Sequence, residues 1–319
     1  MKDIFKFLNE YGVVPVTKIE DAKDALPLAK ALAEGGLPLI EVTFRSDAAA
    51  ESIRNITAEL PDILVGAGTV TDIEKAAQAQ EAGASFIVTP GFNKKVVEYC
   101  LSKDLPVLPG CSSPTDIETA MDYGLNIVKF FPAEAAGGIA TIKAISAPYG
   151  NIRFVPTGGI NTDIMNEYLD FPKVLAIGGS WLTPAGLVKE GRFDEITKIA
   201  QKTVSKMLGF EMVHIGINSD NEEKANKTAK TFGDLFDFEL KHGSSSIFCG
   251  VGIEVNKQKG LGAMGHIAIK TNNIMRAIAY LERIGVEIDY ASAKMKETKM
   301  VAIYLKAEIG GFAVHLLQK

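Results

Sequence analysis

Over the first two-thirds of the chain, short apolar runs alternate with amphipathic segments, and glycine stands at many of the joints. Apolar runs of this length are typical of buried strands, and the segments between them have the spacing of surface helices. The pattern predicts strands at Val13–Thr17, Leu39–Phe44, Ile63–Gly66, Phe86–Thr89, Pro106–Pro109, Ile127–Phe131, Arg153–Pro156 and Val174–Ile177. Helices are expected between them, as at Ala22–Glu34, Ala48–Glu59, Ile73–Ala82 and Pro114–Tyr123.

Eight buried parallel strands, each followed by a helix, predict an α/β fold: a (β/α)8 TIM barrel over residues 1–208. A doubly wound open sheet is the alternative. No GxGxxG motif at the first strand–helix turn supports it. Because barrels place their chemistry at the carboxyl ends of the strands, the polar residues at those ends are the candidate site.

From Phe210 onward the pattern changes, and one order of elements occurs twice. The boundary is expected near Gly209, and residues 210–319 are predicted to form a small α+β domain of two βαβββ modules. The first module is expected at strand Met212–Asn218, helix Asn221–Phe232 and strands Phe236–Leu240, Ser245–Phe248 and Gly252–Asn256. The second is expected at strand Gly265–Lys270, helix Asn273–Arg283 and strands Val286–Asp289, Met300–Leu305 and Phe312–Leu317.

Composition and charge exclude several classes of partner. The 319 residues are 47% hydrophobic and 23% charged, with a net charge of −5, so we expect neither nucleic acid nor anionic membrane as a partner. No segment has the pattern of a signal peptide or a membrane span. The three cysteines are scattered and lack CxxC spacing, which indicates a reducing, cytoplasmic setting and no thiolate metal site: Cys100, Cys111 and Cys249.

Lys129 is a cation inside an apolar strand, between Val128 and Phe130. An unpaired buried ammonium is costly, so we expect such a lysine to lose its proton near neutral pH. A neutral, desolvated lysine is a nucleophile that can form a Schiff base with a carbonyl substrate. A lysine that extends to solvent, or that pairs with a carboxylate, is the structural alternative.

Glu41 is the other charge inside an apolar strand, next to Ile40 and Val42. It is expected either to form an ion pair with Lys129 or Arg45, or to act as a general acid/base beside the imine. The two roles are compatible, because both strand ends face one barrel mouth. Arg45 offers a bidentate clamp for a substrate carboxylate.

Two glycine pairs follow the last two strands of the predicted barrel, Gly158-Gly159 and Gly178-Gly179. Barrels commonly bind phosphate in these two loops. We expect each pair to lead into a helix N-terminus and to present backbone N–H groups to a phosphate. Tight turns alone also explain such glycines.

Several of these motifs occur together and in order, which makes residues 1–208 resemble the 2-dehydro-3-deoxy-6-phosphogluconate (KDPG)/4-hydroxy-2-oxoglutarate (KHG) aldolases. They are Glu41-Val42-Thr43-Phe44-Arg45, Gly66-Ala67-Gly68-Thr69-Val70, Val88-Thr89-Pro90-Gly91, Lys129-Phe130-Phe131-Pro132-Ala133-Glu134, Pro156-Thr157-Gly158-Gly159-Ile160 and Gly178-Gly179-Ser180-Trp181. The resemblance implies a class I aldolase that acts on 2-keto-3-deoxy acids, releases pyruvate, forms homotrimers and needs no cofactor.

The resemblance also implies roles for individual residues. Lys129 would be the Schiff-base lysine, and Glu41 would move protons. Arg45 and Thr69 would hold the pyruvyl carboxylate. The aldehyde side of the substrate and its phosphate would be held by Thr157, Gly158, Gly159, Gly179 and Ser180.

The βαβββ repeat of residues 210–319 resembles the glyoxalase/dioxygenase (vicinal oxygen chelate) superfamily. His214, His266 and His315 stand at strand positions that supply metal ligands in such domains, and Glu254 stands at a fourth. Imidazoles and a carboxylate suit a divalent first-row metal. Core histidines without metal, in a domain that only packs against the barrel or supports its assembly, are the alternative.

Two functional alternatives stay open from the sequence. One is an aldolase for another 2-keto-3-deoxy sugar acid, because one hydroxyl configuration is decided by side-chain geometry near Thr157. The other is a non-catalytic sensor of sugar-acid phosphates, although a sensor would not need both a buried lysine and an acid/base carboxylate.

Overall fold

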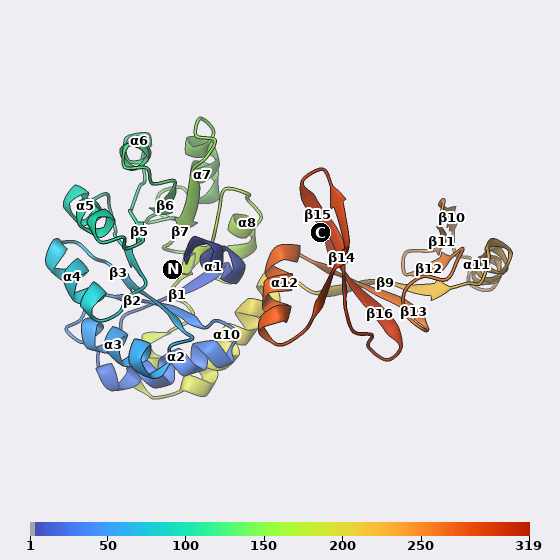
Figure 1. Cartoon of the computed structure of the whole chain (residues 1–319), viewed down its shortest axis with the longest axis horizontal. Helices are drawn as coiled ribbons and strands as arrows, with labels where there is room; N and C mark the ends of the chain where they lie inside the picture. The colour runs from blue at the N-terminus through green and yellow to red at the C-terminus, as the bar shows by residue number, and fades with distance from the viewer. Residues whose placement is uncertain (1–3) are drawn as a thin grey trace. The chain divides into compact units, whose positions relative to one another are not determined.

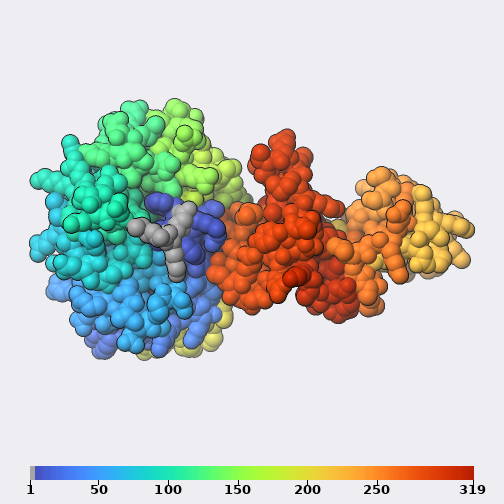
Figure 2. All heavy atoms as spheres, viewed as in Figure 1, coloured from blue at the N-terminus to red at the C-terminus, as the bar shows by residue number. Residues whose placement is uncertain are grey.

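The computed structural model describes residues 4–319. Within this range the chain divides into two compact units, with the boundary between Met207 and Leu208. Figures 1 and 2 show the first unit in blue through green to yellow and the second in yellow-orange through red. Within residues 4–319, none of the helices combines the length and the apolar character that a membrane crossing requires.

The first unit alternates strands and helices along its whole length. Its strands are β1 (Val13–Thr17), β2 (Leu39–Thr43), β3 (Leu64–Gly68), β4 (Phe86–Val88), β5 (Val107–Leu108), β6 (Ile127–Phe130), β7 (Arg153–Pro156) and β8 (Ile177–Gly179). Its helices are α1 (Ile4–Tyr11), α2 (Ala25–Glu34), α3 (Ala49–Glu59), α4 (Ile73–Glu81), α5 (Lys94–Ser102), α6 (Pro114–Asp122), α7 (Gly138–Ser146), α8 (Met165–Leu169), α9 (Ala185–Lys189) and α10 (Phe193–Leu208).

The strands of the first unit form a curled parallel sheet. Six of them pair in the order β5-β4-β3-β2-β1-β8, and β6 pairs with β7. Single parallel bridges join the two groups, from Gly110 to Lys129 and from Thr157 to Gly178. The apolar strand residues are almost entirely buried beneath the surrounding helices (Figure 1). The expected α/β fold is therefore confirmed at the level of a curled parallel sheet covered by helices.

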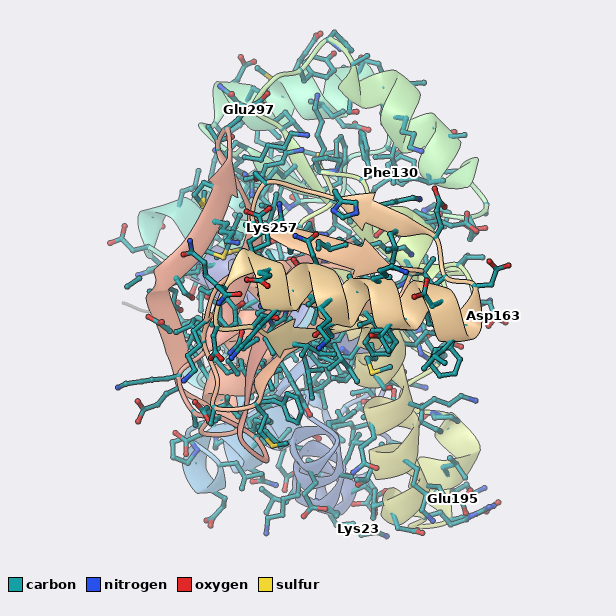
Figure 3. The ribbon with its side chains drawn as sticks, turned by 90° about the vertical axis from the view of Figure 1, so that its right-hand side faces the viewer. Lys23, Phe130, Asp163, Glu195, Lys257 and Glu297 are labelled. Carbon is teal, nitrogen blue, oxygen red and sulfur yellow. The ribbon has the colours of Figure 1, made fainter. Side chains whose placement is uncertain are left out.

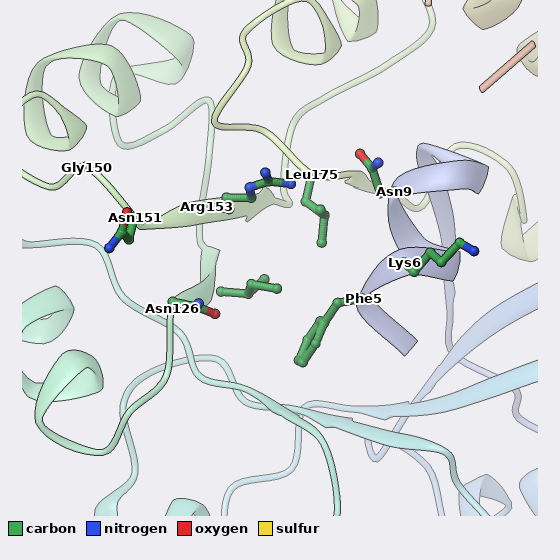
Figure 4. Close-up of a pocket in the computed structure, with 9 residues that line it drawn as sticks. Phe5, Lys6, Asn9, Asn126, Gly150, Asn151, Arg153 and Leu175 are labelled. Atoms are coloured by element: carbon green, nitrogen blue, oxygen red, sulfur yellow. The ribbon is translucent and has the colours of Figure 1, made fainter. Parts of the chain in front are cut away.

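Helix α1 covers the amino ends of the strands. Its buried residues Ile4, Leu8 and Tyr11 follow helical spacing. A cavity of about 450 Å³ is lined by residues of α1 and by residues at the amino ends of β6, β7 and β8, among them Arg153 (Figure 4). This end of such a fold serves stability rather than chemistry, so we look for the functional site at the opposite end.

Most expected elements of the first unit differ from the structure only by one or two residues at an end, but two elements begin later than expected. The last strand was expected at Val174–Ile177, but β8 begins at Ile177, because Val174 forms only a single bridge and the ladder with β1 starts at Ile177. The helix expected from Ala22 starts as a short 3-10 turn over Ala22–Asp24, which the Asp21 side chain caps through the Lys23 amide.

The second unit is built from one order of elements used twice. The first copy is β9 (Glu211–Asn218), α11 (Glu222–Phe236), β10 (Leu240–His242), β11 (Ser246–Cys249) and β12 (Ile253–Asn256). The second copy is β13 (Gly265–Thr271), α12 (Ile274–Arg283), β14 (Ile288–Lys296), β15 (Lys299–Leu305) and β16 (Phe312–Gln318).

The two copies join in one eight-stranded sheet, in the order β10-β11-β12-β9-β13-β16-β15-β14. Their first strands, β9 and β13, pair antiparallel at the centre. One strand prediction is wrong here, because α11 continues through Phe236 and ends at Asp237 in a left-handed conformation, so β10 begins only at Leu240. β14 is also longer than expected and reaches Lys296.

Candidate active site

The buried charges of the first unit come together at the carboxyl ends of its strands. Lys129 on β6 and Glu41 on β2 are only 6% and 4% exposed, and Lys129 Nζ lies 3.6 Å from Glu41 Oε1. Lys129 Nζ also lies 5.3 Å from the centre of the Phe131 ring. The pairing expected between the two charges is therefore present, and it lies at the carboxyl ends of the strands, where the site was expected.

Glu41 Oε1 is fully buried and accepts no hydrogen bond among the described residues. Buried polar atoms are usually hydrogen-bonded. An unsatisfied carboxylate oxygen 3.6 Å from the Lys129 amine is thus free to accept a hydrogen bond from a substrate or a water molecule.

Gly68, at the end of β3, makes room for this carboxylate. A Cβ atom on Gly68 would lie 2.1 Å from Glu41 Oε1, far inside any real contact. The register places Glu41 beside Gly66 and Thr43 beside Gly68. The Gly66-Ala67-Gly68 motif therefore clears space for the acid.

Cys111 is a second potential nucleophile near Lys129, since its backbone N–H donates to the Lys129 carbonyl at 2.8 Å. The side chain is buried, and burial raises the pKa of its thiol to about 12. The thiol is therefore protonated at neutral pH and is not a nucleophile. Lys129 therefore remains the candidate nucleophile of this site.

Arg45 and Thr69 lie at the rim, beyond β2 and β3. Arg45 is exposed, and its Nε donates to Thr43 Oγ1 at 3.1 Å, while Thr43 Oγ1 donates to the Thr17 carbonyl. Thr69 has a φ of +56°, which a β-branched residue rarely adopts. Residues with a strained backbone are common at functional sites. This conformation of Thr69 could not be predicted from a sequence motif.

The Thr157-Gly158-Gly159 loop follows β7 and lies next to the turn that follows β6. Thr157 is 7% exposed, and Gly158 and Gly159 have φ values of +106° and +81°. The turn after Lys129 is tied to this loop by the Glu134 amide, which donates to the Gly158 carbonyl. The left-handed backbone explains why glycines occupy these two positions.

Neither glycine pair leads directly into a helix N-terminus, so that expectation is wrong. The helices that follow start only at Met165 and Ala185, after intervening turns. Each of the two helices has five residues. Any phosphate binding by these loops must rest on the loop amides and the Ser180 hydroxyl.

Gly178 and Gly179 are required by their neighbours. A Cβ on Gly178 would meet Thr157 Oγ1 at 2.3 Å, and one on Gly179 would meet the Trp181 ring at 2.4 Å. Trp181 is half-buried and its Nε1 donates to Thr203 on α10. Ser180, in contrast, is exposed.

Sequence reasoning assigned no role to Glu134 and Tyr168, which the structure joins. The Tyr168 hydroxyl donates to Glu134 Oε1, and a Cβ on Gly159 would lie 2.6 Å from Glu134 Cβ. Burial and the neighbouring Glu134 carboxylate raise the pKa of Tyr168. Glu134 in the Lys129–Glu134 motif was the available signal, but its partner lies 34 residues away.

The predicted metal-ligating residues of the second unit also converge. We refer to His214, His266, His315 and Glu254 as the His–Glu cluster. His214 Nε2 and His266 Nε2 lie 3.2 Å apart, and each lies 3.1 Å from Glu254 Oε2. The contacts from the two rings hold the pKa of Glu254 well below its usual range, whereas burial lowers that of His315 to about 4.

Known proteins resemble the first unit. Residues 4–199 match the model of the KDPG and KHG aldolase family. The chain is 49% identical to the 2-dehydro-3-deoxy-phosphogluconate aldolase of Treponema pallidum (strain Nichols) over 204 residues, which is 64% of this chain and 97% of that protein. It is 43% identical to the KHG/KDPG aldolase of Escherichia coli (strain K12) over 192 residues, which is 60% of this chain and 90% of that one.

Among solved structures, the chain is similar to the KDPG aldolase of Legionella pneumophila, crystallised with pyruvate captured as a covalent carbinolamine intermediate. The TM-score is 0.61 at 37% identity, covering 62% of this chain and 97% of that one. The family model ends at residue 199, so the resemblance of residues 210–319 to glyoxalase-like domains stays a prediction.

Proposed function

Because the chain belongs to the KDPG and KHG aldolase family, we propose that its first unit cleaves KDPG to pyruvate and glyceraldehyde 3-phosphate, and KHG to pyruvate and glyoxylate. The chain is a class I aldolase and therefore an aldehyde-lyase. The observation that carries the assignment of the site is the buried contact of 3.6 Å between Lys129 Nζ and Glu41 Oε1.

Lys129 acts as the nucleophile in this proposal. Its free amine attacks the C2 carbonyl carbon and forms a carbinolamine, and loss of water gives an iminium ion. The position of Lys129 supports this role, because the buried amine stands at the carboxyl end of β6, 3.6 Å from the Glu41 carboxylate. The iminium then accepts the electron pair of the C3–C4 bond as that bond breaks.

Glu41 moves the protons of the same reaction. It accepts the proton of the C4 hydroxyl, directly or through one water, so the aldehyde leaves as C3–C4 cleavage produces an enamine on Lys129. Protonation of the enamine at C3 and hydrolysis of the imine then release pyruvate and restore the amine. The buried, unsatisfied Oε1 of Glu41 supports this role.

We assign the substrate's two charged ends to opposite parts of the mouth. Arg45, oriented by Thr43, and Thr69 would hold the carboxylate next to C2. Thr157 would contact the hydroxyl on the aldehyde side. The phosphate would lie against the loop amides and the hydroxyl of Gly158, Gly159, Gly179 and Ser180.

Three broader features of the protein are part of the same proposal. We infer that the curled sheet acts as one (β/α)8 barrel, since the bridges at Lys129 and Thr157 link its two groups of strands. A homotrimer is inferred from the family resemblance. A cytoplasmic location is supported by three free, buried cysteines.

Steady-state kinetics on a panel of 2-keto-3-deoxy acids, with and without phosphate, tests this function. The proposal expects the highest kcat/KM for KDPG, lower values for KHG and for the epimeric sugar acid, and pyruvate as a product in every case. Lys129→Arg keeps the charge but cannot form this imine, so its turnover should fall by several orders of magnitude while the chain stays folded. Binding of these acids without turnover in the unmodified enzyme would contradict the proposal and favour a sensor.

A further inference from the structure

The cavity of about 450 Å³ at the amino ends of β6 and β7 has a lining that favours anions. Two of its nine described lining residues are cations, Lys6 and Arg153, and none is a carboxylate. Three more carry carboxamides, namely Asn9, Asn126 and Asn151. A concave surface lined by charge of one sign attracts small ions of the opposite sign. This cavity does so in a chain whose net charge is −5.

Three of these polar side chains have unused hydrogen-bonding capacity. Within residues 4–319, the side chains of Asn126, Asn151 and Arg153 form no hydrogen bond or ion pair with another residue. Arg192, in contrast, is exposed but contacts both Glu190 and Glu195. The Arg153 N–H donates to the Asn126 carbonyl at 2.9 Å, so backbone pairing holds these two residues side by side.

Apolar side chains form the rest of the wall. Phe5 of α1 and Ile127 of β6 are half-buried, and Leu175 is buried. In Figure 4 the Phe5 ring, the Asn126 amide and the Arg153 guanidinium surround one space. A ligand that contacts the whole lining must therefore combine an anionic group with a flat or apolar part.

The chemistry of the lining defines this ligand further. The Arg153 guanidinium is a planar fork that binds two oxygens of one phosphate at once, whereas the Lys6 amine already pairs with Glu10 at 3.8 Å. A carboxamide both donates and accepts hydrogen bonds, which matches the edge of a nucleobase. The Phe5 ring offers a face on which a base can stack. The volume lies within the range of about 300–1,000 Å³ that is usual for small-molecule sites.

We propose that this cavity binds a nucleoside monophosphate. Its phosphate lies on Arg153, its base stacks on Phe5, and the carboxamides of Asn126 and Asn151 contact the edge of the base. This site is separate from the candidate active site, and the proposal does not depend on the aldolase function.

The cavity lies at the opposite end of two strands that also carry the candidate active site. β6 begins at Ile127 and carries Lys129, followed by Phe130, which is labelled in Figure 3. β7 begins at Arg153, and Thr157 follows its last residue. Because a strand rises about 3.3 Å per residue, the backbones of Arg153 and Thr157 are separated by roughly 13 Å. A nucleotide in the cavity therefore leaves the mouth open to the substrate.

Isothermal titration calorimetry of the full chain with adenosine monophosphate (AMP) tests the site. We expect one saturable site per chain. Arg153→Met removes the fork, so it should weaken binding about 10–100-fold, the usual contribution of hydrogen bonds to a charged group. Arg54→Met is the matched control, because Arg54 is an exposed arginine of α3 outside this cavity, and it should bind AMP as the unmodified chain does.

Inorganic phosphate and adenosine, titrated separately, test the two halves of the ligand. Each should bind at least about tenfold more weakly than AMP, because each lacks one set of contacts. Phe5→Leu keeps an apolar side chain but removes the ring, so it should weaken binding of AMP and leave that of inorganic phosphate unchanged. Equal affinities for AMP and inorganic phosphate would contradict the nucleoside part of the proposal.

Two variants of the candidate active site separate this test from that of the aldolase function. Lys129→Arg and Ser180→Asp should both bind AMP as the unmodified chain does. Loss of AMP binding in Ser180→Asp would overturn the proposal, because it would place the nucleotide at the mouth instead.

Two further results would also overturn the proposal. One is the absence of saturable AMP binding by the unmodified chain. The other is unchanged affinity in an Arg153→Met chain whose circular dichroism shows it to be folded.

Discussion

Lys129 and Glu41 lie on β6 and β2, which are four strands apart in the first unit, whereas the His–Glu cluster lies on adjacent strands of one sheet. The first site depends on the curl of its sheet, which brings distant strands within 3.6 Å at one mouth. The second depends on register alone. In both units, polar residues within apolar strands come together as a buried cluster, but different geometry assembles each one.

The two sites also differ in what surrounds their polar groups. Around Lys129, the loops carry unusual backbone, including the left-handed Thr69 and Gly158. The His–Glu cluster instead lies on paired strands of one sheet, and its space is created by small residues such as Gly216. The contrast predicts that substitutions at one site leave the other intact, and the following predictions test this independence.

The largest of these effects is expected for Glu41→Gln. The amide keeps the size of the side chain but cannot move the proton, so turnover should fall about 10²–10⁴-fold, the usual contribution of a general acid/base. Capture of pyruvate on Lys129 should persist. Turnover within a few-fold of the unmodified enzyme would reduce Glu41 to a structural partner of Lys129.

A matched pair of glycine substitutions should separate the two sites. In Gly68→Ala the new methyl group would displace Glu41, so turnover should fall about 10²-fold, a typical cost of misplacing a catalytic group by about 1 Å. In Gly216→Ala it would displace the His266 ring of the second unit, so aldolase turnover should stay unchanged. Turnover is measured on both chains. A loss of turnover in Gly216→Ala as well would mean that the two units are coupled.

Tyr168→Phe should have the smallest effect. It removes the hydroxyl that donates to Glu134 beside the Gly158-Gly159 loop. One hydrogen bond contributes roughly 1 kcal/mol, so KM for KDPG should rise about threefold to tenfold. KM for KHG, which has no phosphate, should change less. Equal changes for both substrates would mean that the pair supports the barrel rather than the phosphate loop.

Ser180→Asp offers a control for the same loop region. Ser180 is exposed, whereas a side chain at Gly179 would collide with Trp181 and disturb the fold. The added carboxylate should repel the phosphate of KDPG and leave KHG turnover nearly unchanged.

Much of the first unit could be predicted from its apolar runs. The runs that begin at Val13 and Arg153 give β1 and β7 with their observed bounds, because each is an apolar stretch ended by a polar or turn residue. β8 could not be placed, because Val174 and Leu175 are as apolar and as buried as Ile177, and only pairing with β1 decides where the ladder starts. Helix α1 was not predicted, although Ile4 and Leu8 have helical spacing.

The parts of the site that depend on the type of a side chain could be predicted from the sequence. The parts that depend on backbone conformation could not. A lysine and a glutamate in apolar strands are visible in the sequence, and so are histidines at repeated strand positions. The left-handed conformation of Thr69, the late helices after Gly159 and the hydrogen bond from Tyr168 to Glu134 are tertiary properties. The contacts within the His–Glu cluster are a tertiary property as well, because they depend on the register in which β9 pairs with β13.

In the proposed mechanism, Lys129 forms a covalent imine with its substrate. Borohydride reduction in the presence of pyruvate, followed by digestion and mass spectrometry, detects this imine. We expect one reduced pyruvyl group per chain on the peptide that contains Lys129, and none in Lys129→Arg. Unmodified protein, or a label on Lys143 or another lysine instead, would contradict it.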